Sequence, residues 1–261
     1  MNFKRLEKNW EGLAKKDPMW AILPNPQKKG RKWDNTAFFA SGEYEIKIIL
    51  SLLAKRNIQL PDRLLALDFG CGLGRLSRGL AARFHNVVGV DISPSMVAKA
   101  QKENKEFANI SFIHNKKPDL SLFPNSDMSL VLSITTLQYI PQPSTTNYIT
   151  EFIRVLKKGG VAMFQIPSDD LRDISMSQKI TKCIRIKERL ALIGLGTGFN
   201  MEIHTMLEEE VETVIESCGA VLIGKYYTNH TDPTYDGKLT TSFDKDPSTG
   251  FINTLYIVQK Q

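Results

Sequence analysis

The sequence lacks the features that would mark a disulfide-bonded, metal-binding or membrane-spanning protein. It has only three cysteines in 261 residues, and an odd, scattered set supports neither a disulfide framework nor a metal cage. No apolar run approaches the roughly eighteen residues that a membrane span needs. The first ten residues, MNFKRLEKNW, lack the apolar core of a signal peptide. These absences predict a cytoplasmic protein with no membrane span.

Most of the chain also lacks the excess of positive charge that nucleic-acid binding needs. The net charge of +6 is concentrated in residues 1–35, which hold nine Lys and Arg residues against four Asp and Glu. The remainder is close to neutral, which is unfavourable for binding driven by counterion release. We therefore expect a small-molecule partner rather than a nucleic acid. Nothing in the sequence indicates an oligomeric state.

What the sequence does contain is a regular alternation of strand-like and helix-like segments. Such alternation predicts an α/β fold whose parallel sheet is covered by helices on both faces. The last two expected strands have no helix between them and must be antiparallel to each other. Strands are expected over 64–69, 86–91, 110–114, 128–134, 161–166, 220–227 and 253–259, and helices over 43–55, 74–84, 94–107, 147–160 and 205–218.

Three helix termini follow from capping residues. Ser41 is the expected N-cap of the first helix, and Ser93 caps the third with Pro94 at its first position. Thr205 and Glu208 form the expected capping box of the last helix. A pair of glycines, 159–160, is expected to end the helix before the fifth strand.

Two domains of unequal size are expected. Residues 1–42 form an N-terminal helical, aromatic extension that contains all three tryptophans, Trp10, Trp20 and Trp33. These aromatics either pack on the edge of the sheet or form a lid over a bound ligand. Residues 43–261 form the main domain, with an insertion over 168–204 and a long polar loop over 228–250.

A glycine-rich turn between the first expected strand and helix is the strongest functional signal. In the stretch LLALDFGCGLGRLSRGLAARF, residues 64–84, Asp68 precedes Gly70, Gly72 and Gly74. Arg75 stands where the dinucleotide fingerprint has its last small residue, and no G-K-[ST] follows. A carboxylate beside a pyrophosphate would repel it by about a kcal/mol or more. The same carboxylate favours a ligand that is positively charged at that point.

S-adenosylmethionine satisfies this requirement, because it carries both an ammonium and a sulfonium group. Asp91, at the end of the second expected strand, lies where an acidic residue can accept hydrogen bonds from both ribose hydroxyls. Ile92 and Met96 follow at positions suited to the faces of the adenine. The pattern therefore predicts an S-adenosylmethionine site.

At these residues the chain resembles the class I S-adenosylmethionine-dependent methyltransferases, over about residues 40–261. LDFGCGLGRLSRGLA is similar to their first motif, VVGVDIS to their second, and FIRVLKKGGVAMF to the passage before their fifth strand, with Lys158 in place of a proline. The resemblance implies a Rossmann-like, seven-stranded sheet of order 3-2-1-4-5-7-6 with the last strand antiparallel. Ser129 departs from the acidic residue that commonly opens the fourth strand.

The resemblance also implies the cofactor contacts. Asp68 would lie near the methionine ammonium, the three glycines under the methionyl and ribose parts, and Asp91 on the ribose. Either Asn115 or Asp119 would lie near the adenine amino group. Further expected contacts come from the turn and from the end of the fourth strand: Cys71, Ser133 and Thr135.

Methyl transfer from a sulfonium depends mainly on holding the two reacting atoms in line, and a base is needed only for a hydroxyl or a protonated amine. Thr135 and Thr136 would line the floor beside the methyl group, and the candidate catalytic residues are His204, Gln138 and Tyr139. His204 is either a general base or a structural histidine at a helix entry. His114 is expected in the interior, and His230 in a surface loop.

We therefore predict a methyltransferase that acts on a small-molecule, sugar or lipid-linked acceptor. One alternative is an RNA methyltransferase that uses the basic residues 1–35 and 179–189, although the sequence has no N-P-P-Y motif after the fourth strand. The other is a non-catalytic protein that binds S-adenosylmethionine as a structural ligand or a signal.

Overall fold

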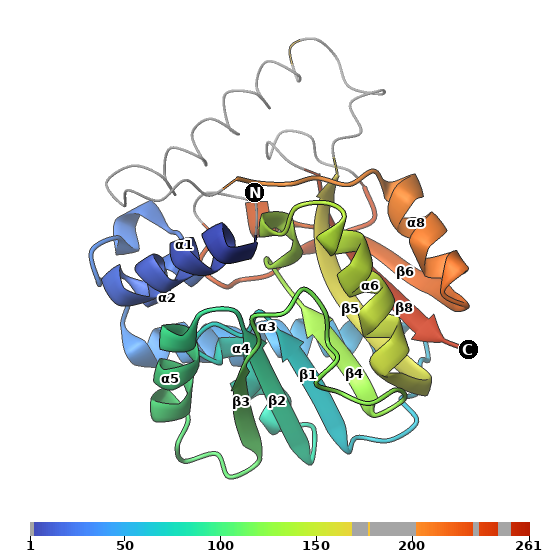
Figure 1. Cartoon of the computed structure of the whole chain (residues 1–261), viewed down its shortest axis with the longest axis horizontal. Coiled ribbons are helices and arrows are strands. Elements are labelled where there is room, and N and C mark those ends of the chain that lie inside the picture. The colour runs from blue at the N-terminus through green and yellow to red at the C-terminus, as the bar shows by residue number, and fades with distance from the viewer. Residues whose placement is uncertain (1–2, 169–176, 178–201, 232–234, 245–251) are drawn as a thin grey trace.

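The computed structural model describes residues 3–168, 177, 202–231, 235–244 and 252–261 (Figure 1). Most of the expected insertion, including its basic stretch 179–189, therefore lies outside the described residues. The helices are α1 Phe3–Lys16, α2 Pro18–Ile22, η1 Pro26–Lys28, α3 Asn35–Lys55, α4 Arg75–Ala81, α5 Pro94–Glu103, η2 Leu137–Tyr139, α6 Ser144–Val155, α8 Glu208–Ser217 and η3 Asn229–Thr231. The strands are β1 Leu65–Phe69, β2 Asn86–Asp91, β3 Ile110–His114, β4 Met128–Ser133, β5 Leu156–Ser168, β6 Ala220–Thr228, β7 Thr241–Ser242 and β8 Ile252–Lys260.

The strands form one sheet of order β3-β2-β1-β4-β5-β8-β6-β7. The pairs among β1 to β5 are parallel, and β8 is antiparallel to both of its neighbours, β5 and β6. Counting β8 as the seventh strand, this is the expected order with an antiparallel last strand. The structure adds β7, a two-residue strand on the edge of β6, within the expected loop 228–250.

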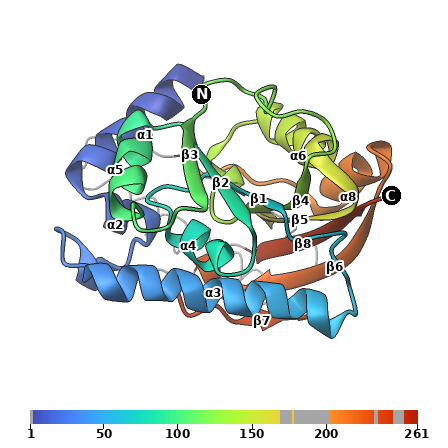
Figure 2. The ribbon, with the colours of Figure 1, turned by 90° about the horizontal axis from the view of Figure 1, so that it is seen from below.

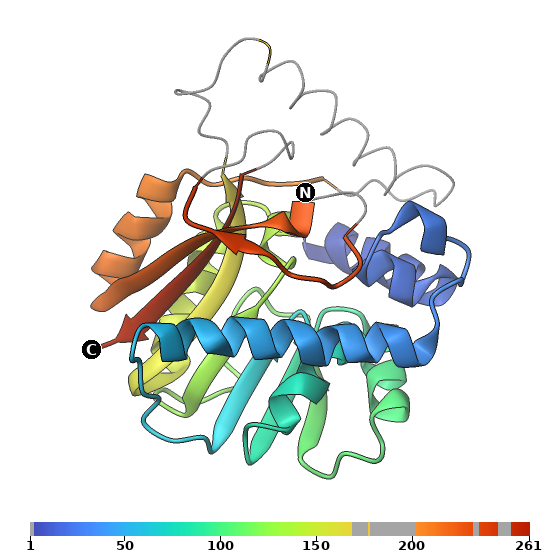
Figure 3. The same ribbon diagram turned by 180° about the vertical axis from the view of Figure 1, so that it is seen from behind.

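Two hydrophobic clusters lie on opposite faces of the sheet. On one face α3 and α4 cover the strands, with Ile46, Leu76 and Leu80 in the buried cluster. On the other face α6 and α8 cover them, with Phe152 and Val211 in the buried cluster. Figure 2 shows these helices on the two sides of the sheet, and Figure 3 shows α3 crossing in front of it. The sheet is therefore covered on both faces, as expected for a parallel α/β fold.

The first helix of the main domain begins earlier than the sequence predicts. Asp34 is its N-cap, and the carboxylate accepts a hydrogen bond from Ala37 N at 2.8 Å. Ser41 is therefore not a cap; it lies inside α3 and donates to Phe38 O. The expected domain boundary at 42/43 thus falls within one continuous helix.

Two other helix ends differ from expectation. The helix α8 begins at Glu208, and Leu207 N donates to Glu210 at 3.0 Å, so Thr205 and Glu208 do not form its capping box. Glu208 instead accepts a hydrogen bond from Lys225 Nζ at 2.8 Å. The helix α6 ends at Val155, and residues 159–160 lie within β5 rather than at a helix end. The Ser93 cap is confirmed, because Met96 N donates to its hydroxyl at 3.2 Å.

None of the helices in the described ranges is both long enough and apolar enough to cross a membrane.

Candidate active site

A cavity opens where the parallel strands end at their carboxyl termini. Its walls come from the ends of β1 and β2, from the residues after β3 and β4, and from α1 and α2, which lie over that end of the sheet (Figure 1). Together with its mouth the cavity holds about 910 Å³ of empty space. The position is where open α/β sheets bind ligands.

The glycine turn forms one wall of the cavity. Gly70 and Gly72 both line it, with φ of +78° and +53°. Backbone in this left-handed region favours glycine, and a Cβ atom on Gly72 would also lie 2.6 Å from the side-chain end of Ile22 in α2. Gly74 has a different role. It is the N-cap of α4, and a Cβ there would lie 2.6 Å from the Phe112 ring, which shows a packing constraint.

Asp91 is fixed beside this turn. Its two carboxylate oxygens accept hydrogen bonds from Gly72 N at 2.9 Å and Ser93 N at 2.8 Å. Burial raises the pKa of Asp91 above its ordinary value, although part of the side chain reaches the cavity. Each carboxylate oxygen has a further lone pair. The group can therefore accept hydroxyl donors from a ligand while the backbone holds it in place.

The expected adenine-binding residues lie next to Asp91. Ile92, Met96 and Asn115 all line the cavity. The Asn115 side chain is held at both ends, because Nδ2 donates to Asp119 O at 2.7 Å and Oδ1 accepts from Lys117 N at 3.1 Å. Asp119 is not among the lining residues, and hydrogen bonds from Ser121 lower the pKa of its carboxylate. Of the two alternatives, the structure brings Asn115 to the cavity.

Three other expected cofactor residues lie behind the cavity wall and are not among its lining residues. The carboxylate of Asp68 is buried and accepts from Ser77 Oγ at 2.6 Å; burial raises its pKa to about 6. Cys71 packs in a hydrophobic cluster of Val97, Ala100 and Phe112. Ser133 is fully buried at the end of β4.

The residues after β4 are divided between the cavity and the interior. Thr135 and Tyr139 line the cavity, and the Tyr139 ring packs edge-on against Trp10 with centroids 5.2 Å apart. Gln138 is buried and does not line it. His204 N donates to Gln138 O at 2.7 Å, and burial lowers the pKa of the imidazole. His204 is also absent from the lining residues, so the structure brings only Tyr139 of the three catalytic candidates to the cavity.

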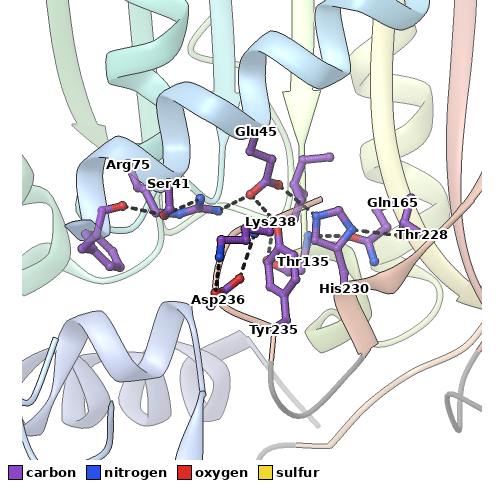
Figure 4. Close-up of polar contacts among 12 residues, drawn as sticks. Ser41, Glu45, Arg75, Thr135, Gln165, Thr228, His230, Tyr235, Asp236 and Lys238 are labelled. Atoms are coloured by element: carbon purple, nitrogen blue, oxygen red, sulfur yellow. Dashed lines mark hydrogen bonds and ion pairs between the residues drawn. The ribbon is translucent and has the colours of Figure 1, made fainter. Parts of the chain in front are cut away.

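The expected environments of two histidines are wrong. His114 is exposed, and its ring nitrogen lies 3.0 Å from Ile92 O. His230 is buried and lines the cavity. Its two ring nitrogens form hydrogen bonds with Glu45 and Thr228, each at 2.9 Å (Figure 4). The loop sequence around His230 gives no sign of this burial.

Sequence reasoning also missed Glu45, which lies at the centre of this cluster. It is fully buried in α3 and forms a 2.8 Å ion pair with Arg75 and a 2.7 Å hydrogen bond with Tyr235. A signal was present, because Glu45 occupies the same helical stripe as Phe38, Ile49 and Leu52, which are all buried. A carboxylate on a buried stripe requires partners elsewhere in the chain.

The N-terminal helix is fixed over the cavity by a carboxylate. Glu11 in α1 accepts hydrogen bonds from Ser93 Oγ at 2.7 Å, from Ser95 N at 3.0 Å and from the Ser95 hydroxyl, at the start of α5. Burial opposes the charge of Glu11, but these hydrogen bonds outweigh it and lower its pKa to about 2. Phe3, Leu6 and Trp10 of α1 thereby become part of the cavity wall.

The part of the chain that forms much of this cavity is similar in sequence to known proteins. Residues 66–160 match the methyltransferase domain family. The chain is 28% identical over 164 residues to trans-aconitate 2-methyltransferase of Streptomyces avermitilis, covering 61% of this chain and 60% of that protein. It is 33% identical over 103 residues to 2-methyl-6-phytyl-1,4-hydroquinone methyltransferase of Synechocystis, covering 39% of this chain and 31% of that protein.

Solved structures share the fold. An S-adenosylmethionine-dependent methyltransferase of Anabaena variabilis has a TM-score of 0.60 at 15% identity and covers 100% of this chain and 96% of its own. Magnesium protoporphyrin IX methyltransferase of Synechocystis with bound SAH has a TM-score of 0.55 at 17% identity, covering 85% of this chain and 84% of its own.

The first curated relatives are matched over only part of their length, from 20% to 60%. The matched part contains the glycine turn, Asp91 and Asn115, which form the cavity wall described above. Residues 66–160 match the methyltransferase domain family, and the fold of the chain is similar to that of solved S-adenosylmethionine-dependent methyltransferases.

Proposed function

We propose that the chain transfers a methyl group from S-adenosylmethionine to a small-molecule, sugar or lipid-linked acceptor. The observation that carries this proposal is the convergence of Gly70, Gly72, Asp91 and Asn115 on one cavity. The names of the curated relatives, which include trans-aconitate and hydroquinone methyltransferases, support a small-molecule acceptor. An enclosed cavity under α1 and α2 also suits a small acceptor better than a nucleic acid.

The residues present fit the cofactor. Asp91 would accept the ribose hydroxyls, Asn115 would face the adenine, and the glycine turn allows close approach of the chain to the ligand. The cofactor supplies an activated methyl group on a positively charged sulfur. The protein holds the acceptor atom in line with it, which is the main source of rate acceleration in such a displacement. The acceptor lone pair forms the new bond while the carbon–sulfur pair goes to sulfur.

We further propose that the N-terminal helices act as the lid. Phe3, Leu6 and Trp10 of α1 and Ile22 of α2 line the cavity, which supports this alternative. The same segment also packs into the body of the protein, because Trp20 is buried in one cluster with residues of α3 and α5. Lid and packing roles are therefore combined in one segment.

The proposal is tested by replacing Asp91. Because Asp91→Ala removes the group that would bind the ribose, we expect calorimetric affinity for S-adenosylmethionine to fall about 10- to 100-fold or more, with the circular dichroism spectrum retained. Asp119→Ala, whose carboxylate does not line the cavity, is the matched control and should leave the affinity unchanged. Unchanged affinity in Asp91→Ala would refute the ribose assignment.

The acceptor class is tested by incubating the protein with methyl-labelled cofactor and a cell extract, and following the label by mass spectrometry. Label in a small molecule supports the proposal. Label in RNA would support the nucleic-acid alternative, and cofactor binding without any labelled product would support a non-catalytic protein.

A further inference from the structure

Three hydroxyl groups of the cavity wall already donate hydrogen bonds to other groups of the protein. Tyr235 Oη donates to Glu45 at 2.7 Å. Thr135 Oγ1 and Thr136 Oγ1 both donate to Ile134 O, at 2.8 and 3.1 Å. All three residues that carry these hydroxyls line the cavity. Each of these oxygens still has a lone pair but no second proton, so the three hydroxyl groups can accept hydrogen bonds from a ligand but cannot donate to it.

The buried carboxylate of Glu45 determines the direction of the hydrogen bond that Tyr235 makes. Burial opposes its charge, but Arg75 at 2.8 Å and the hydrogen bond from His230 hold its pKa well below the ordinary value. A carboxylate has no proton to give, so Tyr235 must be the donor to it, and so must His230 Nε2 at 2.9 Å. The second ring nitrogen of His230, Nδ1, forms a hydrogen bond with Thr228 Oγ1 at 2.9 Å. Figure 4 shows the cluster, with Glu45 between Arg75 and His230.

The described part of the cavity wall offers no Lys or Arg side chain to an anion, and its histidine, His230, is already paired with Glu45. None of the described lining residues is Lys or Arg, and the one carboxylate among them is Asp91. An anionic group entering the cavity would lose its hydration without gaining a cationic partner, which is costly. The rest of the wall under α1 and α2 is apolar or aromatic, with Phe3, Leu6, Trp10 and Ile22.

From this arrangement, and resting on the proposed function, we propose that the methyl acceptor is a largely apolar small molecule that brings its own N–H or O–H donors and carries no anionic group. Its N–H or O–H donates to the oxygens of Tyr235, Thr135 or Thr136, and its apolar body packs under α1. In the transfer the acceptor nitrogen or oxygen forms a bond to the methyl carbon, the carbon–sulfur pair remains on sulfur, and the N–H or O–H proton leaves to water.

Three probes of one shape test this inference: 4-propylphenol, 4-propylaniline and 4-propylbenzoate. Each is added at neutral pH to the full chain loaded with S-adenosylhomocysteine, and binding is measured by ligand-observed NMR. We expect both donor probes to bind, with the benzoate roughly tenfold weaker or worse. The phenol and the aniline also distinguish an oxygen from a nitrogen acceptor, because label transfer from methyl-labelled cofactor shows which one reacts.

Tyr235→Phe removes one of the accepting oxygens and keeps the ring. We expect it to weaken binding of the phenol and the aniline about 3- to 10-fold and to leave binding of the benzoate unchanged. Tyr44→Phe, at an exposed position of the same helix as Glu45, is the matched control. Calorimetric affinity for the cofactor should stay the same in both variants.

Failure of the two donor probes to bind, or tighter binding of the benzoate, overturns the inference. An unchanged probe affinity in Tyr235→Phe overturns the assignment of Tyr235 to this role. Either result, with cofactor affinity intact, leaves the proposed function standing. If the wild-type chain does not bind S-adenosylmethionine at all, the proposed function itself is refuted.

Discussion

The buried carboxylate of Asp68 makes the stability of the chain depend on pH. Burial raises its pKa from the ordinary 3.8 to about 6. The unfolded chain therefore ionises first as pH rises, and the folded chain loses stability between about pH 4 and pH 6, by about 3 kcal/mol for a fully buried group.

Asp68→Asn tests this relation, because the amide keeps an oxygen for the Ser77 hydroxyl but cannot ionise. We expect its melting temperature to exceed that of the wild type at about pH 8 and to match it at about pH 4. Asp119→Asn is the control, since the pKa of Asp119 is lowered and its loss should not stabilise the chain. Equal melting temperatures of Asp68→Asn and wild type at high pH would contradict the prediction.

At the scale of the element, α1 is held over the cavity by the Glu11 carboxylate at the start of α5. Because the pKa of Glu11 lies at about 2, below the ordinary 4.5, its contribution to stability is present above about pH 4.5 and is lost as pH falls toward 2. The helix is therefore held in place at neutral pH.

Glu11→Gln should loosen α1 without unfolding the sheet. The glutamine amide has one accepting oxygen where the carboxylate has two, and it carries no charge, so we estimate a cost of about 1 kcal/mol. We therefore expect the amides of residues 3–16 to exchange hydrogen about fivefold faster. Exchange in β1 and β4 should not change. Glu216→Gln, at an exposed position of α8, serves as the control. Wild-type exchange rates throughout α1 would show that Glu11 does not hold the helix.

The elements could be predicted from sequence wherever one local signal dominates. The apolar runs of β1, β2 and β3 predicted these strands to within one residue. The start of α3 was missed because Ser41 and Asp34 are both good caps, and the aromatic pair Phe38 and Phe39 was assigned to the extension. These aromatics are buried in a cluster with Trp20, and that contact depends on tertiary packing.

At the scale of the whole molecule, the sequence predicted the part of the cavity wall around the glycine turn better than the part formed by His230 and Tyr235. Gly70, Gly72 and Asp91 lie within 22 residues of one another, so their spacing alone brings them together. His230 is separated from its partner Glu45 by 185 positions, and Tyr235 by 190. No local pattern encodes such pairs, because they form only when the sheet brings the segment after β6 next to α3.

The buried Glu45–Arg75 pair should therefore stabilise the molecule as a whole. Glu45→Gln leaves Arg75 charged and buried without its carboxylate, and breaking such a pair costs about 3 to 5 kcal/mol. We expect the urea midpoint of this variant to fall accordingly. The double variant Glu45→Gln, Arg75→Met also removes the unpaired charge and keeps an amide oxygen near Tyr235 and His230, so it should be more stable than Glu45→Gln alone. If Glu45→Gln unfolds at the wild-type midpoint, the buried ion pair does not stabilise the packing of α3 against α4.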